Sequence, residues 1–68
     1  MKLVLNDREL RAEENTFLLA FIEKELQLRS LDGLAVSVNY EVIPKKNWAA
    51  YRLKAGDAIL VIHATAGG

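Results

Sequence analysis

The chain has 68 residues, which is enough for one small domain and leaves no room for a second. Hydrophobic residues make up 51% of it and charged residues 26%, so it can build a core and still keep a hydrated surface. Nine basic residues balance nine acidic ones, which argues against the single-sign field that draws a protein to nucleic acid or to an anionic membrane.

The scarcity of cysteine and histidine argues against several kinds of catalytic and metal site. There is no cysteine for a disulfide or a thiolate nucleophile, and the single histidine, His63, has no cluster of carboxylates near it in the sequence. No apolar run reaches the ~18–20 residues of a membrane span, and the N-terminus lacks a signal-peptide pattern. We therefore expect a cytoplasmic protein that binds no metal or cofactor and is not an enzyme by itself.

The first twelve residues are expected to form a β-hairpin. Lys2 to Asn6 alternates, which places Leu3 and Leu5 on one face of a strand. Asn6-Asp7-Arg8 favours a turn, because Asn and Asp tolerate left-handed backbone conformations. Glu9 to Ala12 then pairs back as the second strand.

An amphipathic helix is predicted from Phe17 to about Leu28, with Asn15 or Thr16 as its N-terminal cap. Most of its apolar residues fall within one broad arc of the helical wheel, and Glu23, Lys24 and Gln27 lie opposite. The helix therefore has a single face to bury.

A strand is predicted at Ala35 to Asn39, followed by a turn and a short strand at Val42-Ile43. Pro44 lacks an N–H donor, so this short strand lies at a sheet edge or ends there. Lys45 to Leu53 predicts an irregular loop with a helical turn, in which Trp48 fills one end of the core.

The strand predicted at Ala58 to Ala64 follows a turn at Ala55-Gly56-Asp57. Its run from Ile59 to Ile62 is continuously apolar, as in a central strand. One helix can cover only one face of the sheet, so we expect a shallow apolar patch on the other face as a candidate partner surface.

Residues 1–64 are expected to form the domain and residues 65–68 a flexible tail ending in Gly67-Gly68. Four extended residues reach ~13–14 Å, and glycine leaves the end of the tail unhindered for entry into a narrow slot. The alternative is an accidental Gly-Gly on a frayed terminus.

The predicted order of elements defines an α+β fold, a mixed sheet of four to five strands with one helix packed across one face. The order, the terminal Gly67-Gly68, and the run from Val38 to Lys45 followed by Trp48 resemble the ThiS family of sulfur carriers. That family signature is Val-Asn, Glu, two aliphatic residues, Pro, a basic residue, and Trp three residues later. The resemblance implies the ubiquitin-like β-grasp fold. Tyr40 departs from the pattern, since the family often has a small or polar residue there.

The resemblance also implies a protein cosubstrate with no catalytic residue of its own. A ubiquitin-activator-like adenylyltransferase would attach AMP from MgATP to Gly68, and a persulfide donor such as a cysteine desulfurase would convert the adenylate to a thiocarboxylate. Thiazole synthase would then take the sulfur into the thiazole ring of thiamine. Thr65, Ala66 and Gly67 would occupy the partner's slot. His63, beside the tail, is expected to be an ordinary strand residue.

Three alternatives stay open. A molybdopterin-synthase small subunit and a ubiquitin-like protein modifier share the terminal Gly-Gly, and a simple binding module would carry it by accident. The Pro44 to Trp48 segment and the short length favour the ThiS family among them.

Overall fold

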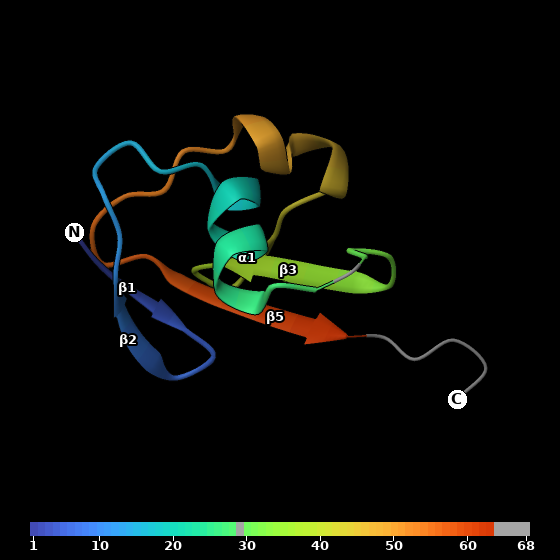
Figure 1. The fold of residues 1–68 in the computed structure, drawn as a ribbon, viewed down its shortest axis with the longest axis horizontal. Coiled ribbons are helices and arrows are strands. Elements are labelled where there is room, and N and C mark those ends of the chain that lie inside the picture. Colours follow the sequence, from blue (N-terminus) through green and yellow to red (C-terminus); the bar gives the residue numbers. More distant parts are fainter. Residues whose placement is uncertain (29, 64–68) are drawn as a thin grey trace.

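The computed structural model describes residues 1–28 and 30–63 and has one helix lying across a five-stranded mixed sheet (Figure 1). The helix α1 spans Leu18–Leu26. The strands are β1 (Lys2–Leu5), β2 (Arg8–Arg11), β3 (Leu34–Val38), β4 (Glu41–Val42) and β5 (Ala58–His63). The predicted α+β class is confirmed. The predicted tail, residues 65–68, and its boundary at Ala64 lie outside the described residues.

The strand order in the sheet is β2-β1-β5-β3-β4. β5 is the central strand, as its continuously apolar sequence predicted. It runs parallel to β1 and antiparallel to β3. The short strand β4 covers Glu41–Val42 rather than the predicted Val42-Ile43. Ile43 lies outside β4, although its N–H still donates to the carbonyl oxygen of Val36 in β3 at 2.9 Å, and its side chain is buried in the core with 6% of its surface exposed.

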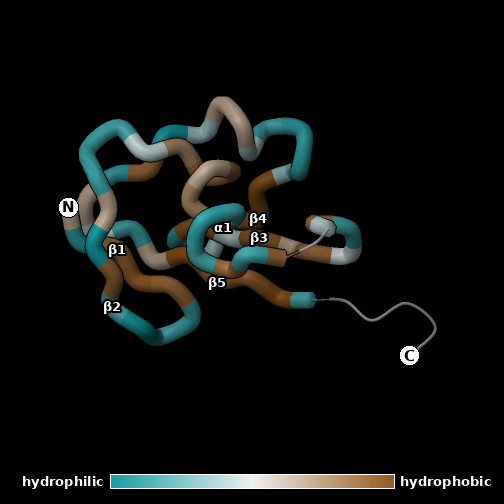
Figure 2. The backbone as a smooth tube through the Cα atoms, viewed as in Figure 1, coloured by the Kyte–Doolittle hydropathy of each residue, from teal (hydrophilic) through white to brown (hydrophobic). Residues whose placement is uncertain are grey.

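The core lies between α1 and the helix-facing side of the sheet, and Figure 2 shows hydrophobic sequence concentrated along the strands that line it. Alternation decides which strand residues enter it, because successive side chains point to opposite faces. The buried apolar residues are Leu3, Leu5, Leu18, Phe21, Ile22, Val36, Val38, Ile43, Trp48, Leu53 and Ile59.

The start of α1 differs from the prediction. Neither Asn15 nor Thr16 caps it; Phe17 holds the N-cap position, without a side-chain hydrogen bond. Instead the N–H of Leu18 donates to the carbonyl oxygen of Tyr51 at 2.7 Å, because the chain around Phe17 pairs with the distant segment at Arg52. A tertiary contact thus satisfies a helix N–H that a local side chain was expected to satisfy.

The end of α1 also differs, since the helix stops two residues before the predicted Leu28. Gln27 adopts a left-handed conformation with φ of 50°, and its N–H donates to the carbonyl oxygen of Glu23. This C-terminal cap turns the chain, so Leu28 leaves the buried face and is 43% exposed.

Trp48 closes one end of the core, as predicted. It lies on the 3-10 helix η1 (Lys45–Ala50) and is 1% exposed. Its Nε1 donates to the carbonyl oxygen of Ile43 at 2.8 Å, so the indole buries its ring without leaving its N–H unpaired.

A buried polar cluster joins the β3–β4 turn to the start of β5. Asp57 is 5% exposed; its carboxylate accepts hydrogen bonds from Asn39 Nδ2 at 2.9 Å and from the backbone N–H of Lys54 at 2.8 Å. Asn39 Oδ1 accepts from the N–H of Ala58, also at 2.9 Å. Asn39 thus ties the β3–β4 turn to the residues at the start of β5.

Candidate functional site

The predicted site residues Thr65, Ala66, Gly67 and Gly68 lie outside the described residues, so the structure bears on them through the strand that precedes them. That strand is β5, at the centre of the sheet. Its last residue, His63, is opposite Leu34 of β3. In the sequence the tail therefore follows the central strand, which pairs with β1 up to Ile59 and with β3 up to His63.

The sheet face opposite α1 bears an exposed apolar patch, which we call the open-face patch. Four large side chains form it. They are Tyr40, Val42, Leu60 and Ile62, with exposed fractions of 99%, 70%, 47% and 55%. Together with Ala35 and Ser37 they border a shallow hollow of about 280 Å³. The predicted apolar face is confirmed.

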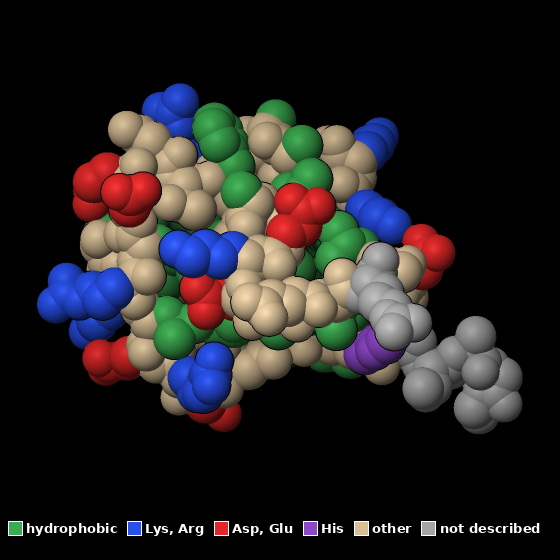
Figure 3. All heavy atoms as spheres, in the orientation of Figure 1, with side chains coloured by type: hydrophobic (Ala, Val, Ile, Leu, Met, Phe, Trp, Pro, Cys, Tyr) green, Lys and Arg blue, Asp and Glu red, His purple; other side chains and the backbone are tan. Residues whose placement is uncertain are grey.

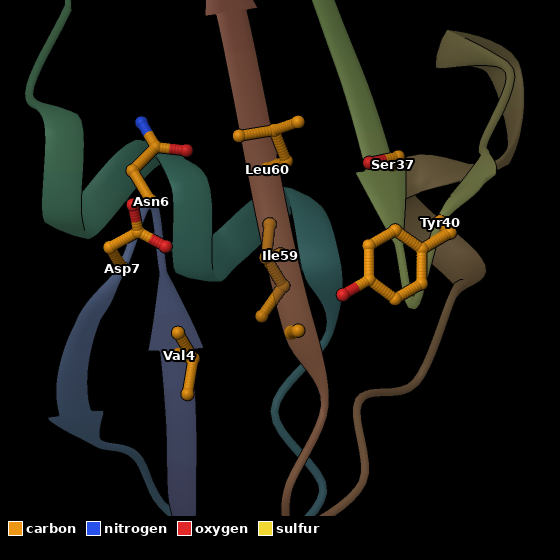
Figure 4. A pocket seen from close by; sticks show the side chains of 8 residues that line it. Val4, Asn6, Asp7, Ser37, Tyr40, Ile59 and Leu60 are labelled. Atoms are coloured by element: carbon orange, nitrogen blue, oxygen red, sulfur yellow. The ribbon is translucent and has the colours of Figure 1, made fainter.

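Tyr40 occupies an unusual conformation. It follows Asn39 in the β3–β4 turn, and the two residues have φ of 71° and 52°, both in the left-handed region. An aromatic residue is uncommon there, because its Cβ crowds the backbone. Figure 4, with α1 behind the strands, shows the Tyr40 ring directed toward β5. The backbone strain thus accompanies a side chain that contributes almost its whole surface to the open face.

Sequence reasoning predicted the open face but not the prominence of Tyr40. The available signal was its departure from the family pattern directly after Asn39, at the position where a two-residue hairpin turn favours glycine. A residue whose backbone conformation is unfavourable and whose side chain is fully exposed is a candidate for binding a partner.

The charged groups form no candidate metal site within residues 1–28 and 30–63. No group of three or more histidine, aspartate or glutamate side chains could hold a metal ion in that part of the chain. Figure 3 shows basic and acidic side chains interspersed on the helix-bearing face. Burial raises the pKa of Tyr51 above its ordinary value of 10.0, and the charges of Asp57 and Glu41 add to this effect, so Tyr51 stays protonated at neutral pH.

No helix within residues 1–28 and 30–63 has the length and apolar character needed to cross a membrane.

The fold and its open face define a small β-grasp protein of the ubiquitin-like class. The chain matches the ThiS family model over residues 2–68, and it therefore belongs to the ThiS family. It is 26% identical to the sulfur carrier protein ThiS of Escherichia coli (strain K12), over all of both chains.

Two solved structures from Geobacter metallireducens share the fold. The crystal structure of the thiamine biosynthesis protein ThiS superposes with a TM-score of 0.84 at 23% identity and covers all of both chains. The solution structure of a thiamine biosynthesis protein gives a TM-score of 0.76 at 23% identity and covers 100% of this chain and 88% of that one.

Proposed function

We propose that this ThiS-family protein carries sulfur for thiamine biosynthesis on the carboxyl group of Gly68. The observation that carries the proposal is the family match, which extends to residue 68 and so includes Gly67-Gly68. The structure supports it by placing β5, the strand that leads to these residues, at the centre of the sheet. The family match also favours ThiS over the molybdopterin-synthase subunit and the protein modifier.

The reaction must first activate an inert group. A terminal carboxyl has a pKa of ~3.3–3.7, so at neutral pH it is an ionised carboxylate and a poor acyl donor. A carboxylate oxygen of Gly68 attacks the α-phosphorus of MgATP in an adenylating partner, and pyrophosphate leaves. The terminal sulfur of a persulfide then attacks the acyl carbon and AMP leaves. A second thiol cleaves the sulfur–sulfur bond, is oxidised to a disulfide with the donor thiol, and releases the thiocarboxylate.

The partner classes follow from these steps. A ubiquitin-activator-like adenylyltransferase uses MgATP, a cysteine desulfurase supplies the persulfide, and a thiazole synthase accepts the sulfur. Thr65, Ala66 and Gly67 lie in the slots of these partners, where a Cβ on Gly67 or Gly68 would hinder access to the carbonyl. The protein itself contributes no catalytic group.

The open-face patch is the surface by which the body of the protein docks on the adenylating partner. Leu60 and Ile62 belong to β5, the strand that continues into the tail. Five residues follow His63 and span at most about 18 Å, so a partner that holds Gly68 must lie close to this end of the sheet. Leu60 and Ile62 supply apolar area on the strand that leads to that end. Tyr40, which follows Asn39 beside the start of β5, adds at the other end of the patch an aromatic anchor of the kind that dominates interface energies.

Replacing Tyr40 with glycine should change the stability of the protein and its binding to the adenylating partner in opposite directions. We expect Tyr40→Gly to raise the free energy of unfolding by about 0.5–1 kcal/mol, because glycine relieves the left-handed strain and no buried contact is lost. We expect the same variant to bind the adenylating partner at least about tenfold more weakly, because the anchor is gone. Urea unfolding and isothermal calorimetry measure the two effects.

A matched pair of leucines tests the same surface. Leu60 and Leu28 are 47% and 43% exposed, but only Leu60 lies in the patch. Leu60→Ser should weaken binding to the adenylating partner and Leu28→Ser should leave it unchanged. Equal effects of the two substitutions would contradict docking through the open face.

The pathway is tested in the source organism. Deleting the gene should make growth depend on added thiazole alcohol or thiamine, and not on the pyrimidine precursor. Growth without thiazole, accompanied by loss of molybdenum-cofactor enzymes, would assign the protein to molybdopterin synthesis instead.

A further inference from the structure

The two strands that flank β5, β1 and β3, pair with different lengths of it. β3 pairs with β5 as far as Leu34 opposite His63, whereas the pairing with β1 ends at Leu5 opposite Ile59. Figure 1 shows β5 continuing past the turn of the β1–β2 hairpin. Beyond Ile59, the side of β5 that faces β1 therefore has no strand of the described fold to pair with.

The side chain of Asn6 takes the place of the missing strand residue. The backbone N–H of Asn6 donates to the carbonyl oxygen of Ile59 at 3.0 Å, which completes the β1 ladder. Its side chain then engages both backbone groups of Val61: Oδ1 accepts from the N–H at 2.9 Å, and Nδ2 donates to the carbonyl oxygen at 3.3 Å. A primary amide offers the same donor and acceptor as a peptide group, so this side chain extends β1 by one residue.

We propose that Asn6 is a positioning residue for the tail, which holds Val61 beside β1 and so fixes the stem from which residues 64–68 leave. Its effect on sulfur loading rests on the proposed function above. Without the Asn6 amide, β5 beyond Ile59 is held on its β3 side alone, so the direction in which the stem points is fixed less closely. A stem with a less fixed direction places the carboxylate at the partner's active site less often, which lowers its effective concentration there.

Asn6 has a second role, in the β1–β2 turn, which the experiment must distinguish from its bonds to Val61. Its φ of 47° lies in the left-handed region, which asparagine tolerates, so it also shapes the β1–β2 turn. Asn6→Gly removes the two side-chain bonds while glycine still accepts this φ. Asn15, with φ of 67°, lies in a loop before α1, so Asn15→Gly is a matched control with the same chemical change.

The first readout is amide hydrogen exchange by NMR. We expect Asn6→Gly to speed exchange of the Val61 N–H at least about tenfold, because it loses its acceptor. Exchange of Leu60, which pairs with Ser37 of β3, should stay within about twofold, as should both amides in Asn15→Gly. Unchanged exchange at Val61 in Asn6→Gly overturns the proposal.

The second readout is the steady-state kinetics of adenylation by the partner enzyme, with the carrier as varied substrate. We expect Asn6→Gly to lower kcat about fivefold with little change in KM, because docking is retained while Gly68 is less often in place. Asn6→Asp keeps the acceptor for Val61 but loses the donor, so its kcat should lie between that of the parent chain and that of Asn6→Gly. Faster exchange at Val61 with an unchanged kcat overturns the positioning role. Failure of the parent chain to be adenylated contradicts the proposed function itself, while the exchange data still decide whether Asn6 holds Val61.

Discussion

Removing Gly68 should lower the rate of adenylation by at least about 100-fold, the largest effect on function that we expect. The shortened chain still ends in a glycine carboxylate, but that group lies about 3.3–3.6 Å short of its place in the slot. Misplacement by even 1 Å can cost about 100-fold in rate. ATP–pyrophosphate exchange catalysed by the adenylating enzyme measures the loss directly.

Two controls accompany this deletion. Its urea midpoint should equal that of the full chain, because Gly68 is five residues beyond the last described strand in the sequence and has no side chain to bury. Gly67→Val keeps the length and should also lose most of the exchange activity, because a β-branched side chain obstructs a narrow slot. Full exchange activity in both variants would mean that the partner does not act on this tail.

Trp48→Ala should cost about 3–5 kcal/mol in the free energy of unfolding, the largest effect on stability that we expect. The indole is 1% exposed and closes the core, so its removal leaves a large cavity in a close-packed interior. A chain of 68 residues has a total stability of roughly 3–10 kcal/mol. The variant should therefore be partly or wholly unfolded at room temperature, as urea titration followed by circular dichroism will show.

Trp48→Phe separates the two contributions of the indole to stability, its apolar volume and its hydrogen bond. It keeps most of the apolar volume but removes the Nε1 donor to the Ile43 carbonyl oxygen, so we expect a smaller loss of about 1–2 kcal/mol. A loss below about 1 kcal/mol for Trp48→Ala would contradict the role of this residue in closing the core.

Local sequence patterns predicted the parts of the fold that local physics controls. Alternation placed Leu3, Leu5, Val36 and Val38 on the buried face, because strand side chains alternate regardless of what they pack against. The continuous apolar run of β5 predicted a central strand, and the one-helix layout left its far face open. The Gly56 turn was predictable because its φ of 88° suits glycine.

Contacts between distant segments explain what sequence reasoning missed. The first N–H of α1 is satisfied by Tyr51, more than thirty residues away, so a search for a local cap could not find it. The Asn6 amide meets Val61 across 55 residues, and its sequence context indicated only a turn. Both contacts depend on how distant segments of the chain come together, and hydrophobic periodicity does not specify that.

The candidate site likewise has one part that the sequence reveals and another that depends on contacts between distant segments. The terminal Gly67-Gly68 is visible in the sequence, and the family match includes it. The open-face patch was predictable as a face but not as a set of residues. Tyr40 and Val42 join it through the β3–β4 turn and the short edge strand, whose geometry depends on the Asn39–Asp57 hydrogen bond.

The most direct test of the proposed function is the intact mass of the protein after incubation with MgATP, its adenylating enzyme and a persulfide donor. Sulfur carriage predicts a mass gain equal to the exchange of one oxygen for one sulfur, located on the peptide that contains Gly68. The gain should require ATP and should disappear when Gly68 is deleted. An unchanged mass, with an adenylating enzyme that is active on its own carrier under the same conditions, would contradict the assignment of this protein as a sulfur carrier.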